Sequence, residues 1–60
     1  MEAKRINEIL MRMGGSKCRI SHLLKNSFCS LEEIDQMVKN GFLIISDDYV
    51  IKTDKAKEIW

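Results

Sequence analysis

The sequence predicts a small α+β domain. Apolar residues recur at helical spacing over residues 2–13 and 31–38. Two runs rich in β-branched and aromatic residues, 42–46 and 49–53, then follow on either side of Asp47-Asp48. The chain has 60 residues, enough for one domain with a small core. We therefore expect residues 1–60 to form a single domain of three helices, a two-stranded β-hairpin and a short C-terminal helix.

The first helix is predicted over residues 2–13. Its apolar residues fall on one stripe because they follow i, i+3, i+4, i+7 spacing. Glycine readily adopts the left-handed conformation that commonly ends a helix, so we expect the helix to end at Gly14-Gly15. The residues of the stripe are Ala3, Ile6, Ile9, Leu10 and Met13.

A second helix is predicted over residues 17–25, with Ser16 as its N-cap. Its buried side would consist of Ile20, Leu23 and Leu24. In the short connection that follows, we expect Phe28 to fill the core where the chain turns.

The third helix has the clearest start signal. Ser30-Leu31-Glu32-Glu33 matches a capping box, in which the Ser30 hydroxyl accepts from the Glu33 amide while the Glu33 side chain reaches back. Asn40-Gly41 would end the helix. Its apolar face is predicted to contain Leu31, Ile34, Met37 and Val38.

The two β runs predict a hairpin with a two-residue turn at Asp47-Asp48, since aspartate tolerates positive φ. A turn of that length would pair Ile45 with Val50 and Ile44 with Ile51. Thr53 or Asp54 is then expected to cap a last helix over residues 55–60.

Composition and charge narrow the function classes. The chain starts with a charged amphipathic stretch and contains no apolar run of about 20 residues, so we expect no signal peptide, no membrane span and a cytoplasmic location. The net charge of +1 is weak support for nucleic-acid binding. The charge is unevenly divided, however. Residues 1–29 carry six basic and two acidic side chains, and residues 30–60 carry four basic and seven acidic ones.

Cys18, His22 and Cys29 are the soft metal ligands of the chain. Three such residues without a CxxC motif do not close a structural zinc site, so we expect no metal and no cofactor. A Cys18–Cys29 disulfide is conceivable, but two half-buried thiols are the simpler interpretation. With one histidine and no glycine-rich phosphate loop, the sequence shows no catalytic constellation, and we expect no enzyme.

The order of helices followed by a hairpin resembles the winged helix-turn-helix family. Residues 37–43, Met-Val-Lys-Asn-Gly-Phe-Leu, resemble the way such domains open their wing, and residues 53–59, Thr-Asp-Lys-Ala-Lys-Glu-Ile, resemble the start of their last helix. Gly14-Gly15-Ser16-Lys17 is similar to the first helix junction of small archaeal winged-helix DNA-binding proteins. The sequence departs from the family at Lys52, where an apolar residue is usual.

This resemblance implies a small DNA-binding protein, a transcriptional regulator that binds duplex DNA as a homodimer. Gln36, Lys39 and Asn40 of the third helix would meet base edges or phosphates. Phosphate contacts would come from Lys17, Arg19, Lys25 and Lys52, and the dimer interface would contain Met11, Ile59 and Trp60. The alternative is a protein–protein interaction module, because Glu32, Glu33, Asp35 and the Asp47-Asp48 turn make the third helix and wing acidic.

Overall fold

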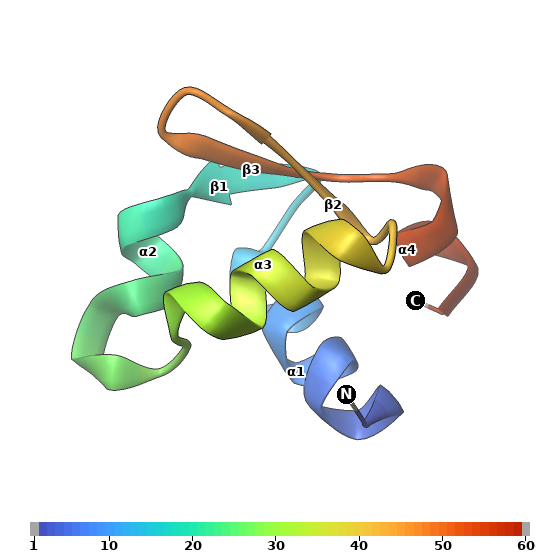
Figure 1. The fold of residues 1–60 in the computed structure, drawn as a ribbon, viewed down its shortest axis with the longest axis horizontal. Helices are drawn as coiled ribbons and strands as arrows, with labels where there is room; N and C mark the ends of the chain where they lie inside the picture. The colour runs from blue at the N-terminus through green and yellow to red at the C-terminus, as the bar shows by residue number, and fades with distance from the viewer. Residues whose placement is uncertain (1, 60) are drawn as a thin grey trace.

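The structure is a computed structural model that describes residues 2–59 and the side chains of residues 2–56. Figure 1 shows a sheet along one side of the molecule, with the helices packed against its other side. The structure confirms the predicted α+β class, with helices and a β-sheet in one small domain. The elements in chain order are α1 (Ala3–Met13), β1 (Lys17–Arg19), α2 (Ile20–Leu24), the 3-10 turn η1 (Lys25–Ser27), α3 (Leu31–Lys39), β2 (Leu43–Ser46), β3 (Tyr49–Lys52) and α4 (Asp54–Ile59).

The sheet is antiparallel and has three strands in the order β1-β3-β2. The predicted hairpin is present in the predicted register, with Ile45 opposite Val50 and Ile44 opposite Ile51. Asp47, the first turn residue, has a φ of 53°. The prediction of a two-stranded sheet was wrong. A third strand, β1, pairs with the other edge of β3 and places Cys18 opposite Val50.

The predicted second helix was wrong in its first half. Residues 17–19 form β1, and Ser16 is no helix cap: its carbonyl accepts from the Lys52 amide at 2.8 Å. At the other end of β1, the Ile20 amide donates to the Asp48 carbonyl at 2.7 Å. Pairing with β3 satisfies backbone groups that an exposed helix start would leave to water, and this outweighs local propensity.

α1 begins and ends close to the predicted positions. Gly14, with φ of 75°, is its C-cap and donates its amide to the Met11 carbonyl at 3.1 Å. Ile6, Ile9, Leu10 and Met13 are buried, which confirms the predicted stripe apart from Ala3 at the exposed first turn.

The capping box of α3 is confirmed, since the Ser30 hydroxyl accepts from the Glu33 amide and the Glu33 carboxylate accepts from the Ser30 amide. Ile34 and Met37 are buried, and Val38 packs partly against the core. The prediction for Leu31 was wrong: its side chain is 65% exposed. Leu31 is the first helical residue and lies about 60° around the helix from Ile34, so it projects past the core.

α4 is preceded by Thr53, one of the two predicted caps. The Thr53 hydroxyl accepts from the Ala56 amide at 3.4 Å and also donates to the Gly41 carbonyl. This places the start of α4 beside the end of α3. No helix within residues 2–59 has the length and apolar character needed to cross a membrane.

The core lies between the sheet and the helices. Partly buried residues that pack against it include Ile20, Leu24 and Phe28, as predicted. Its buried apolar side chains are Ile6, Ile9, Leu10, Met13, Leu23, Cys29, Ile34, Met37, Phe42, Leu43, Val50 and Ala56.

Candidate nucleic-acid interface

The exposed side of α3 carries three of the predicted contact residues. Gln36 and Lys39 are exposed on the helix, and Asn40, its C-cap, is exposed at its end. The side-chain amides of Gln36 and Asn40 make no hydrogen bond to the part of the chain that the structure describes. The structure therefore brings these three side chains together on one surface, with their polar groups directed to solvent.

Glu33, one of the acidic residues of α3, is engaged inside the molecule. Arg5 of α1 holds its carboxylate through two contacts, Nε to Oε2 at 2.6 Å and Nη2 to Oε1 at 3.0 Å. This hydrogen bonding lowers the pKa of Glu33 to about 2. Because the carboxylate is paired and also serves the capping box, it adds little negative charge to the exposed face of α3.

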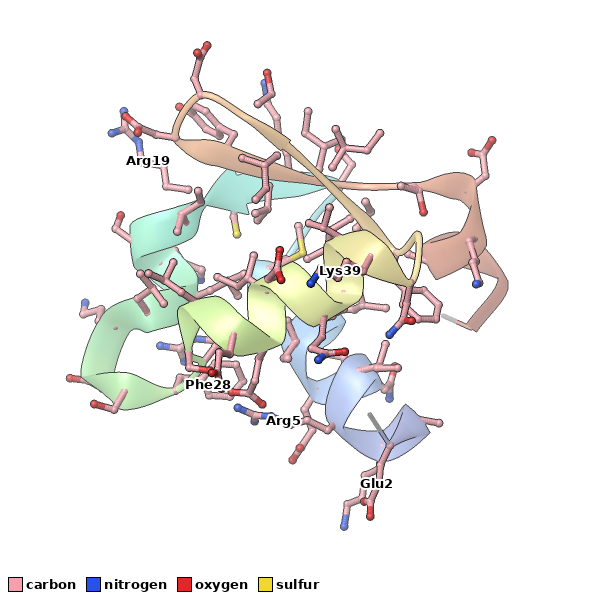
Figure 2. The ribbon with its side chains drawn as sticks, viewed as in Figure 1. Glu2, Arg5, Arg19, Phe28 and Lys39 are labelled. Carbon is pink, nitrogen blue, oxygen red and sulfur yellow. The ribbon has the colours of Figure 1, made fainter. Side chains whose placement is uncertain are left out.

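Phe28 extends the same network. Arg5 donates through Nη2 to the Phe28 carbonyl, and its guanidinium lies 4.9 Å from the center of the Phe28 ring. Figure 2 shows these two side chains beside each other at the start of α3. The Arg12 guanidinium lies 5.2 Å from the same ring. Two cations of α1 thus fix the segment that leads into α3.

The remaining charges of α3 lie in the open. Lys39 Nζ is 3.1 Å from an Asp35 carboxylate oxygen, with both side chains largely exposed. An exposed pair of this kind is worth roughly 0–1 kcal/mol, so Lys39 can exchange Asp35 for another anion at small cost. Lys55 adds a positive charge at this end of α3, where its Nζ donates to the Asn40 carbonyl at 2.8 Å. Glu32 stays exposed at the other end of the helix.

Lys17 and Arg19 lie on a different surface from α3. Both are exposed on β1, opposite Ile51 and Tyr49 of β3. Lys17 Nζ is 5.3 Å and Arg19 Cζ is 5.5 Å from the center of the Tyr49 ring. Lys17 and Arg19 precede α2 and do not lie on it, and the Ile20 amide at the start of this five-residue helix donates to the Asp48 carbonyl.

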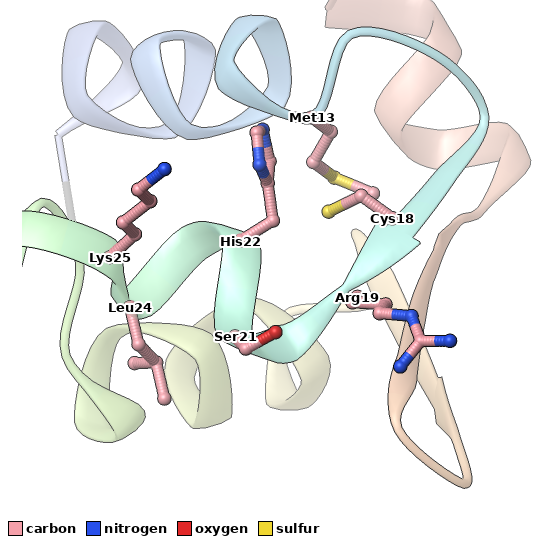
Figure 3. A pocket seen from close by; sticks show the side chains of 7 residues that line it. All are labelled: Met13, Cys18, Arg19, Ser21, His22, Leu24 and Lys25. Carbon is pink, nitrogen blue, oxygen red and sulfur yellow. The ribbon is translucent and has the colours of Figure 1, made fainter.

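Lys25 lies in η1, at the border of a shallow open groove beside α2 (Figure 3). His22, which also borders the groove, makes a hydrogen bond of 2.9 Å from its Nε2 to the Arg12 carbonyl. Cys18 and Met13 also line this groove, as Figure 3 shows. The residues around the groove are Met13, Cys18, Arg19, Ser21, His22, Leu24 and Lys25.

Lys52 was wrongly predicted to contact phosphate. It is the last residue of β3 and is only 7% exposed, on the side of the strand that also buries Val50. Burial lowers the pKa of its ammonium group, an effect that nearby Cys18 partly opposes.

Both cysteines are free thiols in the structure. Cys29 is buried, Cys18 is half-buried, and burial raises the pKa of each thiol. Cys18 belongs to β1 and His22 to α2. Within the described residues, no three side chains of histidine, cysteine, aspartate or glutamate gather into a candidate metal site.

The proposed dimer contacts are described only in part. Met11 is 62% exposed on α1, away from the buried stripe. The side chains of Ile59 and Trp60 lie outside the described residues, so this part of the interface stays a prediction.

Tyr49 and Arg5 are the candidate functional residues that the sequence did not indicate. Tyr49 becomes notable only when β1 places two cations beside it, and three residues are too few for a periodicity signal. The sequence pattern predicts that Arg5 faces solvent on its helix. Its partner Glu33 is 28 positions away, so no local signal indicates the pair.

The comparisons with known proteins add no family to this account. No family model, curated protein sequence or solved structure matches the chain, so its fold and candidate site stand on the residues described above.

Proposed function

We propose that the protein is a small winged helix-turn-helix protein that binds duplex DNA and acts as a transcriptional regulator. α3 is the recognition helix of this proposal. The observation that carries it is the exposed surface formed by Gln36, Lys39 and Asn40 on a helix whose start is fixed by a capping box and by Arg5. The order of the helices and the hairpin supports the same assignment.

The side chains suit the chemistry of the major groove. The amides of Gln36 and Asn40 can each donate and accept at one adenine edge, and Lys39 can donate to guanine or to a phosphate. Pairing of Glu33 with Arg5 removes part of the repulsion that three acidic residues would cause against DNA. Glu32 remains as a repelling charge at the start of α3.

The first test is fluorescence anisotropy with a labeled mixed-sequence duplex at low salt. Glu32→Gln is expected to tighten binding, while Glu2→Gln, which removes an exposed glutamate beside the start of α1, leaves binding nearly unchanged. The double variant Gln36→Ala/Asn40→Ala should weaken binding and relax its sequence preference. Equal effects of the two glutamate variants would count against docking through α3.

Homodimer formation is also part of the proposal, because the operators of helix-turn-helix proteins commonly mirror a two-fold axis. The exposed Met11 side chain supports an apolar contact on α1. Sedimentation equilibrium of wild type and Met11→Lys tests it. The wild type is expected to dimerise and the variant to shift toward monomer, and a wild type that stays monomeric with and without DNA would remove this part.

A protein–protein interaction module is the second candidate function. The exposed Leu31 (65%), Ile44 (54%) and Ile45 (48%) side chains favor it, because DNA contacts alone give no reason for their exposure. The acidic turn at Asp47-Asp48 would then meet a basic partner. Retention on heparin separates the two functions, since a DNA binder is retained and an acidic-faced module passes through.

A further inference from the structure

The outer face of the sheet is a second surface with a character of its own. Cross-strand partners share a face, so the registers of β1-β3 and β2-β3 place one set of side chains on the side away from the helices. Figure 1 shows no helix on this side, and Figure 2 shows Arg19 extending away from the body of the molecule. The six side chains of this outer sheet face are Lys17, Arg19, Ile44, Ser46, Tyr49 and Ile51.

Charge and aromatic character are combined on the outer sheet face. It holds two cations and no acidic side chain, and within the described residues neither Lys17 nor Arg19 forms an ion pair. Both cations lie beside the Tyr49 ring, at 5.3 and 5.5 Å from its center. On its other side, Tyr49 faces Ser46 of β2, which has a small side chain. Ile51 and Ile44 continue the apolar surface along the strands.

We propose that the outer sheet face binds a single-stranded nucleic acid. A base would stack on Tyr49, with Ile44 and Ile51 beside it, while Lys17 and Arg19 bind the adjacent phosphates. Binding without sequence preference in this class combines a positive track for the backbone with aromatic faces for the bases. Here Lys17 and Arg19 supply the positive charge, and Tyr49 supplies one aromatic face. A duplex suits this face less well, because its bases are stacked inside and cannot reach Tyr49.

The placement of charges also indicates the path that a bound nucleic acid would take across the outer sheet face. The cations stand along β1, whereas Asp47-Asp48 lies at the hairpin turn, at one end of the face. Arg19 lies at the end of β1 beside the turn, and Lys17 lies at the end away from it. A polyanion would therefore run from Arg19 toward Lys17 and away from the turn, where like charges repel it. This proposal is independent of DNA docking by α3, since it uses another surface and another form of nucleic acid.

Fluorescence anisotropy of the full chain tests the proposal. The probes are labeled oligothymidylate and oligouridylate of about 12 nucleotides, which distinguish DNA from RNA, and a mixed-sequence duplex of similar length. At least one of the two single strands should bind. Substitutions on the outer sheet face should weaken single-strand binding more than duplex binding. Lys17→Gln/Arg19→Gln should reduce single-strand affinity about tenfold or more at low salt and lower the salt slope by about 1.4, the value for two lost phosphate contacts.

Further variants separate this surface from general charge and from folding. Lys4→Gln/Arg12→Gln removes the same charge from exposed positions elsewhere and should change the salt slope little. Tyr49→Leu should weaken single-strand binding about fivefold to 150-fold, and Tyr49→Phe should retain it, because the ring still stacks. Far-UV circular dichroism of each variant confirms that it is folded. The proposal is overturned if the double variant at Lys17 and Arg19 and its control lose single-strand affinity equally, or if Tyr49→Leu loses none. Loss of duplex binding alone in the α3 variants leaves it standing.

Discussion

Arg5 joins parts of the chain that are distant in sequence. Its guanidinium binds the Glu33 carboxylate at the start of α3 and the Phe28 carbonyl just before it, and it stacks on the Phe28 ring. Bidentate contacts between arginine and carboxylate are among the stronger polar interactions in proteins. We therefore regard this network as the part of the molecule that sets the position of α3 relative to α1.

Glu33→Gln is expected to remove an acid-dependent part of the stability. The folded-state pKa of Glu33, about 2, lies below its ordinary value of 4.5, so its contribution is present above pH 4.5 and is lost as the pH falls toward 2. Glutamine still completes a capping box, which isolates the loss of charge. Urea unfolding of wild type and variant should show a free-energy difference near neutral pH that shrinks toward pH 2.

The neighboring Glu32 provides the control. Its side chain is exposed and removes the same charge when replaced by glutamine. Glu32→Gln should change the free energy of unfolding by no more than about 0.5 kcal/mol. If Glu33→Gln behaves like Glu32→Gln at every pH, the network does not stabilise the fold.

Lys52→Met addresses the buried lysine. Because burial lowers the folded-state pKa of Lys52 below its ordinary value of 10.5, the unfolded chain binds this proton more tightly, and stability rises as the pH approaches 10.5. Methionine lacks this dependence. The unfolding free energy of the variant minus that of the wild type should be largest near neutral pH. This difference should fall at higher pH, because the wild type gains stability there. Lys4→Met, at an exposed position, is the control for replacing a lysine by methionine.

At the scale of elements, what the sequence predicted depended on how local the signal was. α3 and the β2-β3 hairpin were predicted with their cap and register, because a capping box and a two-residue turn involve neighboring residues. β1 was missed, because its partner β3 lies about 30 residues away and three residues carry no period. For the candidate site too, local features were predictable and features set by distant residues were not. Exposure of Gln36, Lys39 and Asn40 follows from helical spacing, while burial of Lys52 depends on which face of β3 the helices cover.

The end of α1 offers a matched pair of glycine variants. Gly14 has a φ of 75° and Gly15 has no positive φ, and a Cβ at either position would meet no atom within 4 Å. Gly14→Ala should therefore cost about 1–2 kcal/mol through backbone strain alone. Gly15→Ala should be neutral or stabilise by up to about 1 kcal/mol, since alanine restricts the unfolded chain. Thermal unfolding measures both, and equal effects would show that the left-handed C-cap contributes nothing.

At the scale of the whole molecule, the candidate contacts lie on separate surfaces. α3 presents Gln36, Lys39 and Asn40 to solvent, whereas Lys17 and Arg19 stand on the outer sheet face. The uneven charge along the sequence is thus only partly a division in space, because β1, from the basic half, lies within a sheet whose other strands come from the acidic half. Binding at the two surfaces can therefore be measured separately.

The central claim is that α3 docks on duplex DNA, and backbone amide chemical-shift mapping with a mixed-sequence duplex tests it most directly. The account predicts that shift changes concentrate on α3 and Asn40, with the largest at Gln36, Lys39 and Asn40, and that they fade as salt is raised. Changes confined to other surfaces, or no changes at low salt, would contradict it.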